Sequence, residues 1–333
     1  MKASAPFRFS KTRLAAMAAA LACAALAAPA QAQSKYPSRP ISLVVGYAAG
    51  GSTDKLARLV AQAMQDDLGQ SVVVENRPGA AGNLGASAVA LANPDGYTLF
   101  MATVSSHAIN PWLYPKSGVD PLKSFEHVAL VARYPLLMAA TPNSGIKTPE
   151  EALTFLRNNP SGAFYSSAGV GSAGHLSGEL FKLMGKVSMT HVAYKGGGPA
   201  MMGAMSGEVS VMFDPIPAML PQVKAGKLTA IAVTSNLRSP ALPDVPSLNE
   251  QALPGFDVTS WAGIVAPAKT APEILQRLRA SVARALDTPR VKATLQADGA
   301  QVSFLPGEQF RVFNQAEISR WGEVIRNAKI SVQ

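Results

Sequence analysis

Apolar residues along the chain alternate between short continuous runs and longer stretches with helical spacing. The run Ile41–Val45 is β-branched, apolar and preceded by proline, which predicts a buried strand. Between 55 and 68, apolar residues recur three or four positions apart, which predicts a helix. The two segments are joined by Gly46–Asp54, a glycine-rich turn whose last three residues are candidates for the helix N-cap.

The same alternation continues through most of the chain. Further strands are predicted at 71–75, 97–101, 128–133, 136–141, 163–166, 189–193, 209–213, 228–234, 258–266 and 301–305. Helices are predicted at 84–91, from 148, within 168–184, after 199, and at 218–224, 271–286, 288–296 and 307–327, and 103–111 is predicted to be a polar loop. This repetition predicts an α/β fold in which mainly parallel sheets are covered by helices on both faces.

Two places predict crossings between separate sheets. Tyr134–Pro135 interrupts the apolar segments on either side of it, and 258–266 is a second apolar stretch placed to return the chain to the first sheet. We therefore expect two lobes joined by two hinge strands. The expected division is 34–133 plus 260–333 for lobe 1 and 134–259 for lobe 2.

The glycine-rich and polar turns all fall where a strand ends and a helix begins. In open α/β sheets ligands bind outside the carboxyl ends of the strands, here in the cleft between the lobes. At Gly46–Asp54, free amides and the positive end of a helix favour a carboxylate or other small anion. A tight connection that binds nothing explains the same residues equally well.

The first residues have the pattern of an export signal. Basic residues precede an apolar run at 14–28, and Ala30-Gln31-Ala32 has the form of a cleavage site. We expect a signal peptide at 1–32, cleavage after Ala32 and a periplasmic location. Lipidation of Cys23 is the alternative processing that the segment leaves open.

Removing that segment changes charge and cysteine content. Four of the 30 basic residues and none of the 21 acidic ones lie in it, so the net charge falls from +9 to 26 − 21 = +5. The single cysteine, Cys23, leaves too, which excludes thiol chemistry and disulfides in the exported chain. The remaining cations are scattered, which disfavours nucleic-acid binding and fits an anionic ligand.

A second glycine-rich turn follows the strand at 163–166. Gly169–Gly174 formally matches G-x-G-x-x-G, but no acidic residue stands about 20 positions further on, where a dinucleotide site needs one. A small carboxylate held by Ser166, Ser167 and the amides around Gly171 and Ser172 fits the segment better than a dinucleotide does.

Two other strand ends add candidate polar groups to the same lobe. The turn Tyr194–Pro199 is either a flexible connection or the opposite wall of a pocket. Asp214 is a lone carboxylate at the end of an apolar strand. It either accepts hydrogen bonds from a ligand ammonium or hydroxyl, or caps the following helix.

Catalytic and metal motifs are not found in the sequence. There is no G-x-S-x-G and no H-E-x-x-H, and the four histidines are dispersed. The chain is therefore predicted to bind rather than to catalyse, with no cofactor. An active site assembled from distant residues is not excluded by sequence, because such sites are recognised by geometry.

An ordered set of motifs resembles a known family. It comprises Tyr36-Pro37-Ser38-Arg39-Pro40-Ile41, Gly50-Gly51-Ser52-Thr53-Asp54, Val74-Glu75-Asn76-Arg77-Pro78-Gly79-Ala80-Ala81-Gly82, Asp95-Gly96-Tyr97-Thr98-Leu99, Ser166-Ser167-Ala168-Gly169, His175-Leu176, Tyr194-Lys195-Gly196, Gly226-Lys227-Leu228 and Leu242-Pro243-Asp244-Val245-Pro246-Ser247. The set resembles the Bug-type receptors, the periplasmic solute-binding components of tripartite tricarboxylate transporters, and it spans essentially the whole mature chain.

The resemblance implies a type II periplasmic-binding-protein fold that closes on its ligand by a hinge. It places a ligand carboxylate against the loops 47–53 and 79–82 of the first lobe. The loop 166–175, which we call the serine loop, and the 194–198 turn then contact the rest of the ligand. The ligand-binding residues that we predict are Tyr47, Gly51, Ser52, Thr53, Ala80, Gly82, Ser166, Ser167, Gly171, Tyr194 and Asp214. Tyr47 departs from the phenylalanine common in the family, which puts the transfer of specificity in doubt.

These observations lead to a functional hypothesis. The chain is expected to be a monomeric periplasmic receptor that captures a small carboxylate and presents it to subunits of a membrane transporter. The ligand classes left open are di- and tricarboxylates, amino acids and aromatic acids. A periplasmic hydrolase on a two-lobe scaffold and a ligand sensor for a histidine-kinase partner are the alternatives.

Overall fold

The computed structural model describes residues 36–327 and 330–331. The chain divides after Ser38, and the fold described below lies in the unit Arg39–Gln333. The predicted signal peptide at 1–32 lies outside the described residues.

Ten strands form one mixed sheet in the order β2-β1-β3-β9-β4-β7-β5-β6, with β10 and β8 also pairing with β4. The strands are β1 (Ile41–Val45), β2 (Val72–Asn76), β3 (Thr98–Thr103), β4 (Phe125–Ala140), β5 (Phe164–Ser167), β6 (Thr190–Ala193), β7 (Val211–Pro215), β8 (Thr229–Val233), β9 (Thr259–Pro267) and β10 (Gln301–Pro306).

Helices cover the sheet. The longer ones are α2 (Ser52–Leu68), α3 (Asn83–Ala90), α5 (Pro149–Asn158), α6 (Ala173–Gly185), α7 (Gly197–Ser206), α8 (Ile216–Lys224), α10 (Pro272–Asp287), α11 (Pro289–Ala297) and α12 (Gly307–Asn327). The shorter ones are η1 (Ala80–Gly82), η2 (Ser105–Ile109), α4 (Asn110–Leu113), η3 (Pro142–Ser144) and α9 (Leu248–Gln251).

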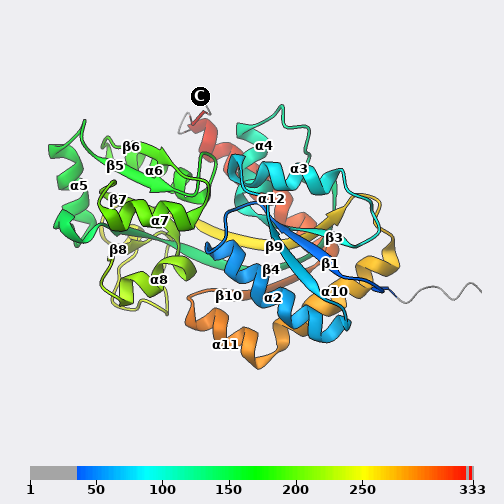
Figure 1. Ribbon diagram of the computed structural model, residues 1–333. Helices are drawn as coiled ribbons and strands as arrows, with labels where there is room; N and C mark the ends of the chain where they lie inside the picture. The colour runs from blue at the N-terminus through cyan, green and yellow to red at the C-terminus, as the bar shows by residue number, and fades with distance from the viewer. Residues whose placement is uncertain (1–35, 328–329, 332–333) are drawn as a thin grey trace, which may run out of the picture. The chain divides into compact units, whose positions relative to one another are not determined.

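The long strands β4 and β9 join two groups of elements. Figure 1 shows them running between β1–β3 with α2, α3 and α10–α12, which we call lobe 1, and β5–β8 with α5–α8, which we call lobe 2. The two strands are antiparallel partners from Phe125 opposite Pro267 to Pro135 opposite Thr259. The expected two-lobe α/β fold is therefore present.

The prediction of two separate strands around Tyr134–Pro135 was wrong, because β4 is one strand of 16 residues. Pro135 lies where β4 changes partners: up to this residue it faces β9, and from Leu136 it faces β7. A proline cannot donate to a strand ladder and is tolerated where pairing is interrupted. The amide of the next residue, Leu136, donates to the Thr234 side chain (2.9 Å).

Strand direction differs between the outer and central parts of the sheet. Pairing is parallel within β2-β1-β3 and within β7-β5-β6, as the strand-helix alternation predicts. All pairs that involve β4 or β9 are antiparallel. The parallel groups therefore point the carboxyl ends of their strands, and the turns that follow, toward the region between the lobes.

Local sequence signals explain most helix boundaries. Thr148 caps α5 with a reciprocal capping box to Glu151. At α2 the N-cap is Gly51, and no side chain caps it, so none of the three predicted cap residues has that role. The predicted loop at 103–111 is largely helical, formed by η2 and the start of α4.

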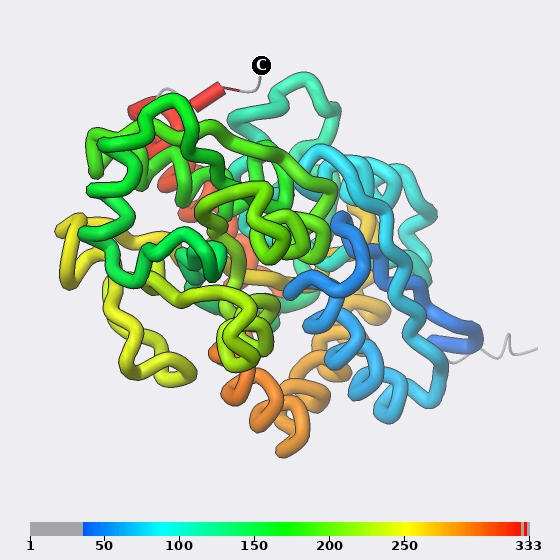
Figure 2. The backbone as a smooth tube through the Cα atoms, turned by 60° about the vertical axis from the view of Figure 1, so that its left-hand side comes forward, coloured from blue at the N-terminus to red at the C-terminus, as the bar shows by residue number. Residues whose placement is uncertain are grey.

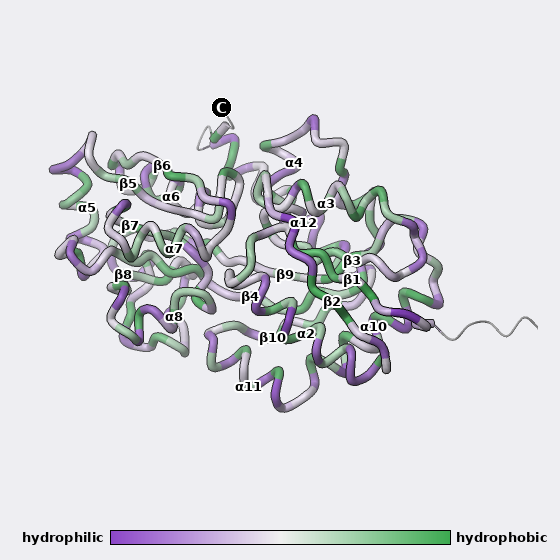
Figure 3. Tube along the Cα trace, viewed as in Figure 1, coloured by the Kyte–Doolittle hydropathy of each residue, from purple (hydrophilic) through white to green (hydrophobic). Residues whose placement is uncertain are grey.

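Apolar residues concentrate in the strands. The strands β1 and β3 are almost entirely buried, and Figure 3 shows hydrophobic residues along the strands, with hydrophilic residues mainly on outer helices and loops. One buried cluster includes Phe100, Phe213 and Trp261, and therefore extends from β3 through β9 to β7. The core thus supports the strands that carry the two walls of the region between the lobes.

Candidate functional site

The turns before α2 and α7 meet between the lobes. The amide of Ala48 donates to the carbonyl of Lys195 (3.4 Å), and in Figure 2 the blue start of α2 reaches the green segments of lobe 2. Further hydrogen bonds join the lobes, among them Ala173 N to Ser105 Oγ (3.2 Å), the Tyr114 hydroxyl to the Val170 carbonyl (3.1 Å) and the Ser52 hydroxyl to the Pro215 carbonyl (3.5 Å). The lobes are therefore in contact in this arrangement.

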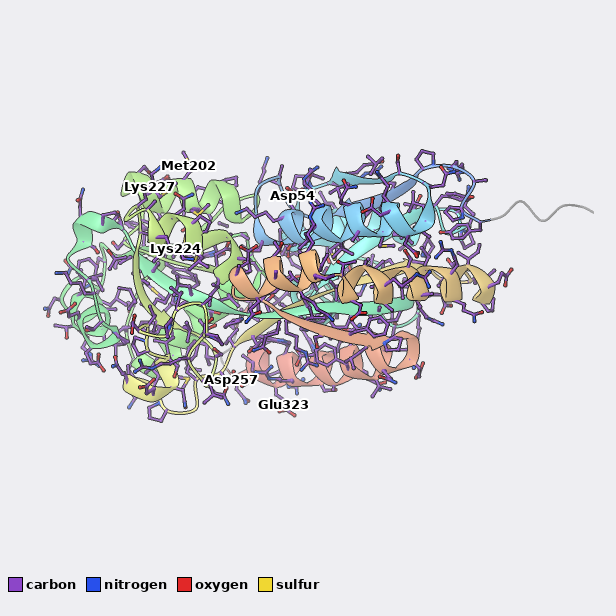
Figure 4. The ribbon with its side chains drawn as sticks, turned by 90° about the horizontal axis from the view of Figure 1, so that it is seen from below. Asp54, Met202, Lys224, Lys227, Asp257 and Glu323 are labelled. Atoms are coloured by element: carbon purple, nitrogen blue, oxygen red, sulfur yellow. The ribbon has the colours of Figure 1, made fainter. Side chains whose placement is uncertain are left out.

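Asp54 fixes the lobe 1 turn Gly46–Asp54. Its carboxylate, almost fully buried, accepts hydrogen bonds from Gly50 N (3.0 Å), Asn76 Nδ2 (2.9 Å) and Arg58 Nε (3.1 Å). Burial acts to raise the pKa of Asp54, but these partners outweigh it and hold the pKa below its ordinary value. Figure 4 shows Asp54 at the end of α2 that faces lobe 2.

Tyr47 lies in the same turn with its ring enclosed. Its hydroxyl donates to the Ala81 carbonyl (3.1 Å), and its own carbonyl accepts from Asn76 Nδ2 (3.0 Å). Burial raises the pKa of the Tyr47 hydroxyl, which therefore stays neutral at physiological pH. Tyr47 thus presents mainly its ring to the space between the lobes.

Uncharged groups fix the serine loop of lobe 2. Ser167 Oγ lies 2.7 Å from His191 Nε2 and accepts from Ser172 Oγ (3.1 Å) and Gly169 N (3.2 Å). Ser172 is the N-cap of α6 and accepts from the amide of His175. Hydroxyls and imidazoles therefore hold this wall.

His175 and His191 stack face to face behind the loop, with ring centroids 4.3 Å apart. Burial lowers the pKa of His175 to about 4 and that of His191 to about 3. Both rings are therefore neutral at pH 7.

A small cavity, lined in part by hydroxyl-bearing residues, lies between the turns. Its volume is about 40 Å³, enough for roughly three waters or one small ligand group. Its lining comes from α2, β3, η2, β4, α6, α7, β7 and β9, so both lobes and both hinge strands contribute. We call it the Asp214 cavity; it is lined by Tyr47, Gly51, Ser52, Thr53, Thr103, Ser105, Tyr134, Ala168, Ser172, Ala173, Gly174, Gly197, Asp214, Pro215 and Ser260.

A larger cavity adjoins it. The volume is about 270 Å³, and Tyr47 and Ala168 line both cavities. We call this second space the Lys195 cavity; it is lined by Gly46, Tyr47, Gly79, Ala80, Ala81, Tyr114, Ala168, Gly169, Val170, Ala193, Tyr194 and Lys195.

Seven of the predicted ligand-binding residues line these cavities. Tyr47, Gly51, Ser52, Thr53 and Asp214 line the Asp214 cavity, and Ala80 and Tyr194, again with Tyr47, line the Lys195 cavity. Gly82, Ser166, Ser167 and Gly171 line neither. Contact of any of these residues with a ligand stays a prediction.

The four residues outside the cavities have partners within the walls. Ser166 donates to the Ala200 carbonyl (3.1 Å), and the Gly171 amide donates to His175 Nδ1 (3.2 Å). Gly82, at a φ of 97°, packs so closely on Gly46 that a Cβ on Gly46 would overlap it. These residues therefore stabilise the walls of the cavities without lining them.

Five hydroxyl-bearing residues that line the Asp214 cavity are not in the predicted set of ligand-binding residues, although the amide of Ser172 was expected near a carboxylate: Thr103, Ser105, Tyr134, Ser172 and Ser260. Thr103 and Ser105 belong to the stretch predicted to be a polar loop. Ser260 is a buried polar residue in an apolar strand, a signal that points to a site or a hydrogen-bond partner.

The pair Ser167–His191 has the distance of a nucleophile and its base, although the histidines are far apart in sequence. Ser167, however, is fully buried and lines neither cavity. The geometry therefore fits a structural hydrogen bond. Within residues 36–327 and 330–331, no group of three or more His, Cys, Asp or Glu residues could hold a metal ion. No helix in this part of the chain is long and apolar enough to span a membrane.

Comparison with known proteins identifies the family. Residues 56–330 match the model of the tripartite tricarboxylate transporter family receptor. The chain is 34% identical to protein BugT of Bordetella pertussis over 307 residues, 92% of this chain and 94% of BugT.

Two solved structures are similar along most of the chain. The periplasmic binding protein BugD is 33% identical, with a TM-score of 0.87 over 90% of this chain and all of BugD. MatC of Rhodopseudomonas palustris with bound malate is 36% identical, with a TM-score of 0.83 over 87% of this chain and all of MatC. The chain therefore belongs to the receptor family of the tripartite tricarboxylate transporters, whose members are solute-binding proteins.

Proposed function

We propose that this receptor captures a small carboxylate in the Asp214 and Lys195 cavities and presents it to the membrane subunits of a tripartite transporter. The observation that supports this most directly is the Asp214 cavity, whose lining comes from both lobes and from both hinge strands. A ligand that contacts both lobes stabilises the closed arrangement over an open one. The related MatC holds malate, a small carboxylate.

Release and capture require the lobes to separate. Ala48, Ser105 and Tyr114 of lobe 1 each make a hydrogen bond to lobe 2, so an open form must break these contacts. The hinge that we propose is the paired segment of β4 and β9, with the lobe boundaries at 133/134 and 259/260. Closure excludes water and strengthens the polar contacts to the ligand.

Export is part of the proposal. The basic and apolar pattern of residues 1–32 is that of a signal peptide cleaved after Ala32, and the related BugD is a periplasmic binding protein. The receptor acts without converting its ligand, since the Ser167–His191 pair lies behind the cavity wall. Delivery to a sensor kinase in place of a transporter remains the alternative use of the same binding event.

Native mass spectrometry of protein purified without refolding tests the proposal. We expect a co-purified small acid, and a thermal-shift screen of carboxylates is expected to raise the melting temperature with that acid or its close analogues. The recovered acid should be chemically unchanged after prolonged incubation. Failure of any carboxylate to shift the melting temperature, or formation of a product, would contradict the proposal.

A further inference from the structure

Asp214 is a buried carboxylate that has no hydrogen-bond partner among the residues that the structure describes. Its residue is 3% exposed, and no described residue donates a hydrogen bond to it. Buried carboxylates are normally paired or hydrogen-bonded, because an uncompensated buried charge is costly. The missing partner therefore points to a group that the ligand supplies.

The described residues that surround Asp214 in the cavity are uncharged. Lobe 1 contributes Tyr47 and serine and threonine hydroxyls, the hinge strands contribute Tyr134 and Ser260, and α6 contributes Ser172. From α7 comes Gly197, which packs on the carboxylate so closely that a Cβ there would overlap it. Among the residues that line the cavity, none is a lysine, an arginine or a histidine.

This environment distinguishes between two kinds of ligand group. Burial raises the pKa of Asp214 to about 7. A cation placed against the carboxylate would favour its ionised form, and the N-terminal end of α7 favours that form too. A ligand carboxylate in the same cavity would instead face a like charge unless Asp214 were protonated.

The two cavities differ in volume, so each fits a different part of a ligand. The Asp214 cavity, at about 40 Å³, accommodates a group as small as an ammonium with a water. The adjoining Lys195 cavity, at about 270 Å³, takes a larger part of the ligand and has Lys195 in its lining. A carboxylate near Lys195 and a cationic group near Asp214 would each meet a complementary charge.

Resting on the receptor function proposed above, we propose that the ligand is an amino acid. Asp214 accepts hydrogen bonds from its ammonium group in the Asp214 cavity, while its carboxylate lies in the Lys195 cavity. Asp214 is then the residue that selects an amine-bearing acid over the same acid without the amine.

Calorimetric titration with matched pairs tests the inference. The probes are L-aspartate with succinate, L-glutamate with glutarate, and L-alanine with propionate. In at least one pair, the amine-bearing member is expected to bind at least ten-fold more tightly at pH 8. Its affinity is expected to rise about ten-fold from pH 6 to pH 8, with proton release near pH 7, because binding requires ionised Asp214.

The variant Asp214→Asn keeps the size of the side chain and removes its charge. It is expected to weaken binding of the amine-bearing acid at least ten-fold and to abolish the pH dependence of that binding. A melting curve confirms that the variant is folded. The wild-type pH dependence tests the inference independently if the variant does not fold.

The outcomes separate this inference from the receptor function. Tighter binding of the amine-free members, or affinity that falls with rising pH, would overturn the role given to Asp214 and leave the receptor function intact. The same holds if Asp214→Asn binds the amine-bearing acid normally. If no acid in any pair binds and the carboxylate screen is also negative, both proposals fail.

Discussion

The two walls of the Asp214 cavity are built from the same kind of element but are held by different chemistry. In lobe 1 the turn before α2 is fixed by the ionised Asp54, which binds Gly50, Arg58 and Asn76. In lobe 2 the turn before α6 is fixed by the neutral groups of Ser167, Ser172, His175 and His191, with distances from 2.7 to 3.2 Å.

This difference determines how each wall responds to pH. The pKa of Asp54 lies below its ordinary value. Its contribution to the free energy of unfolding is therefore fully present at every pH above that ordinary value. The lobe 2 histidines have depressed pKa values and must be neutral to fit. We call the lobe 2 wall, held by Ser167, Ser172, His175 and His191, the neutral wall, and the lobe 1 wall, held by Asp54, the ionic wall. Lowering the pH from 6.5 to 4 therefore destabilises the neutral wall and leaves the ionic wall unchanged.

The largest expected effect concerns His175. Below pH 6.5 the unfolded chain binds a proton at this residue, while the folded chain, with a pKa of about 4, does not. Stability therefore falls as the pH drops from 6.5 to 4, by about 3 kcal/mol for this residue at 1.36 kcal/mol for each pH unit. In His175→Gln, the part of the pH-dependent loss of stability that comes from His175 should be absent. Urea unfolding of both proteins at pH 7 and pH 4.5 measures this difference. If the unfolding free energies of wild type and His175→Gln depended equally on pH, the proposed difference between the two walls would be wrong.

The second effect concerns the ionic wall. Asp54→Asn keeps the shape of the side chain but weakens charge-assisted hydrogen bonds to three partners, and we expect a loss of about 2 kcal/mol in unfolding free energy at pH 7. Asp66→Asn is the matched control, because Asp66 lies on the same helix and makes only an exposed contact with Gln62. The control should change by less than about 0.5 kcal/mol. Equal losses in the two variants would mean that Asp54 contributes only helix-surface charge.

The elements of both walls were predictable from sequence, and their internal chemistry was only partly so. The strand-turn-helix pattern identified both turns, because hydrophobic periodicity and glycine are local signals. The Ser167–His191 contact depends on the parallel pairing of β5 with β6, which joins residues 24 apart. Such pairings are not specified by local pattern.

The residues that line the Asp214 cavity were also only partly predictable from local sequence pattern. Asp214 was recognisable as a polar residue ending an apolar strand, and it lines the cavity. Tyr134 was assigned only to the hinge, since nothing local indicates that it lines the same cavity as the first residues of α2. The continuity of β4 through Pro135 was missed for a related reason: a proline is compatible with a strand only where its pairing changes, and the pairing is a tertiary property.

The smallest expected effect separates positioning from structure within the neutral wall. Ser167 lines neither cavity, but it accepts a hydrogen bond from Ser172, which lines the Asp214 cavity. Ser167→Ala leaves the Ser172 hydroxyl free to rotate, so affinity for the carboxylate identified by mass spectrometry should fall about five-fold, near 1 kcal/mol.

Ser166→Ala is the matched control, because Ser166 is equally buried on the same strand but donates to the Ala200 carbonyl. It should destabilise the protein comparably while leaving affinity within two-fold of wild type. If both variants bind equally weakly, the loss reflects general disturbance of β5. A loss in Ser167→Ala alone would show that the neutral wall acts on the ligand through Ser172, whereas the ionic wall acts by holding the backbone of its turn.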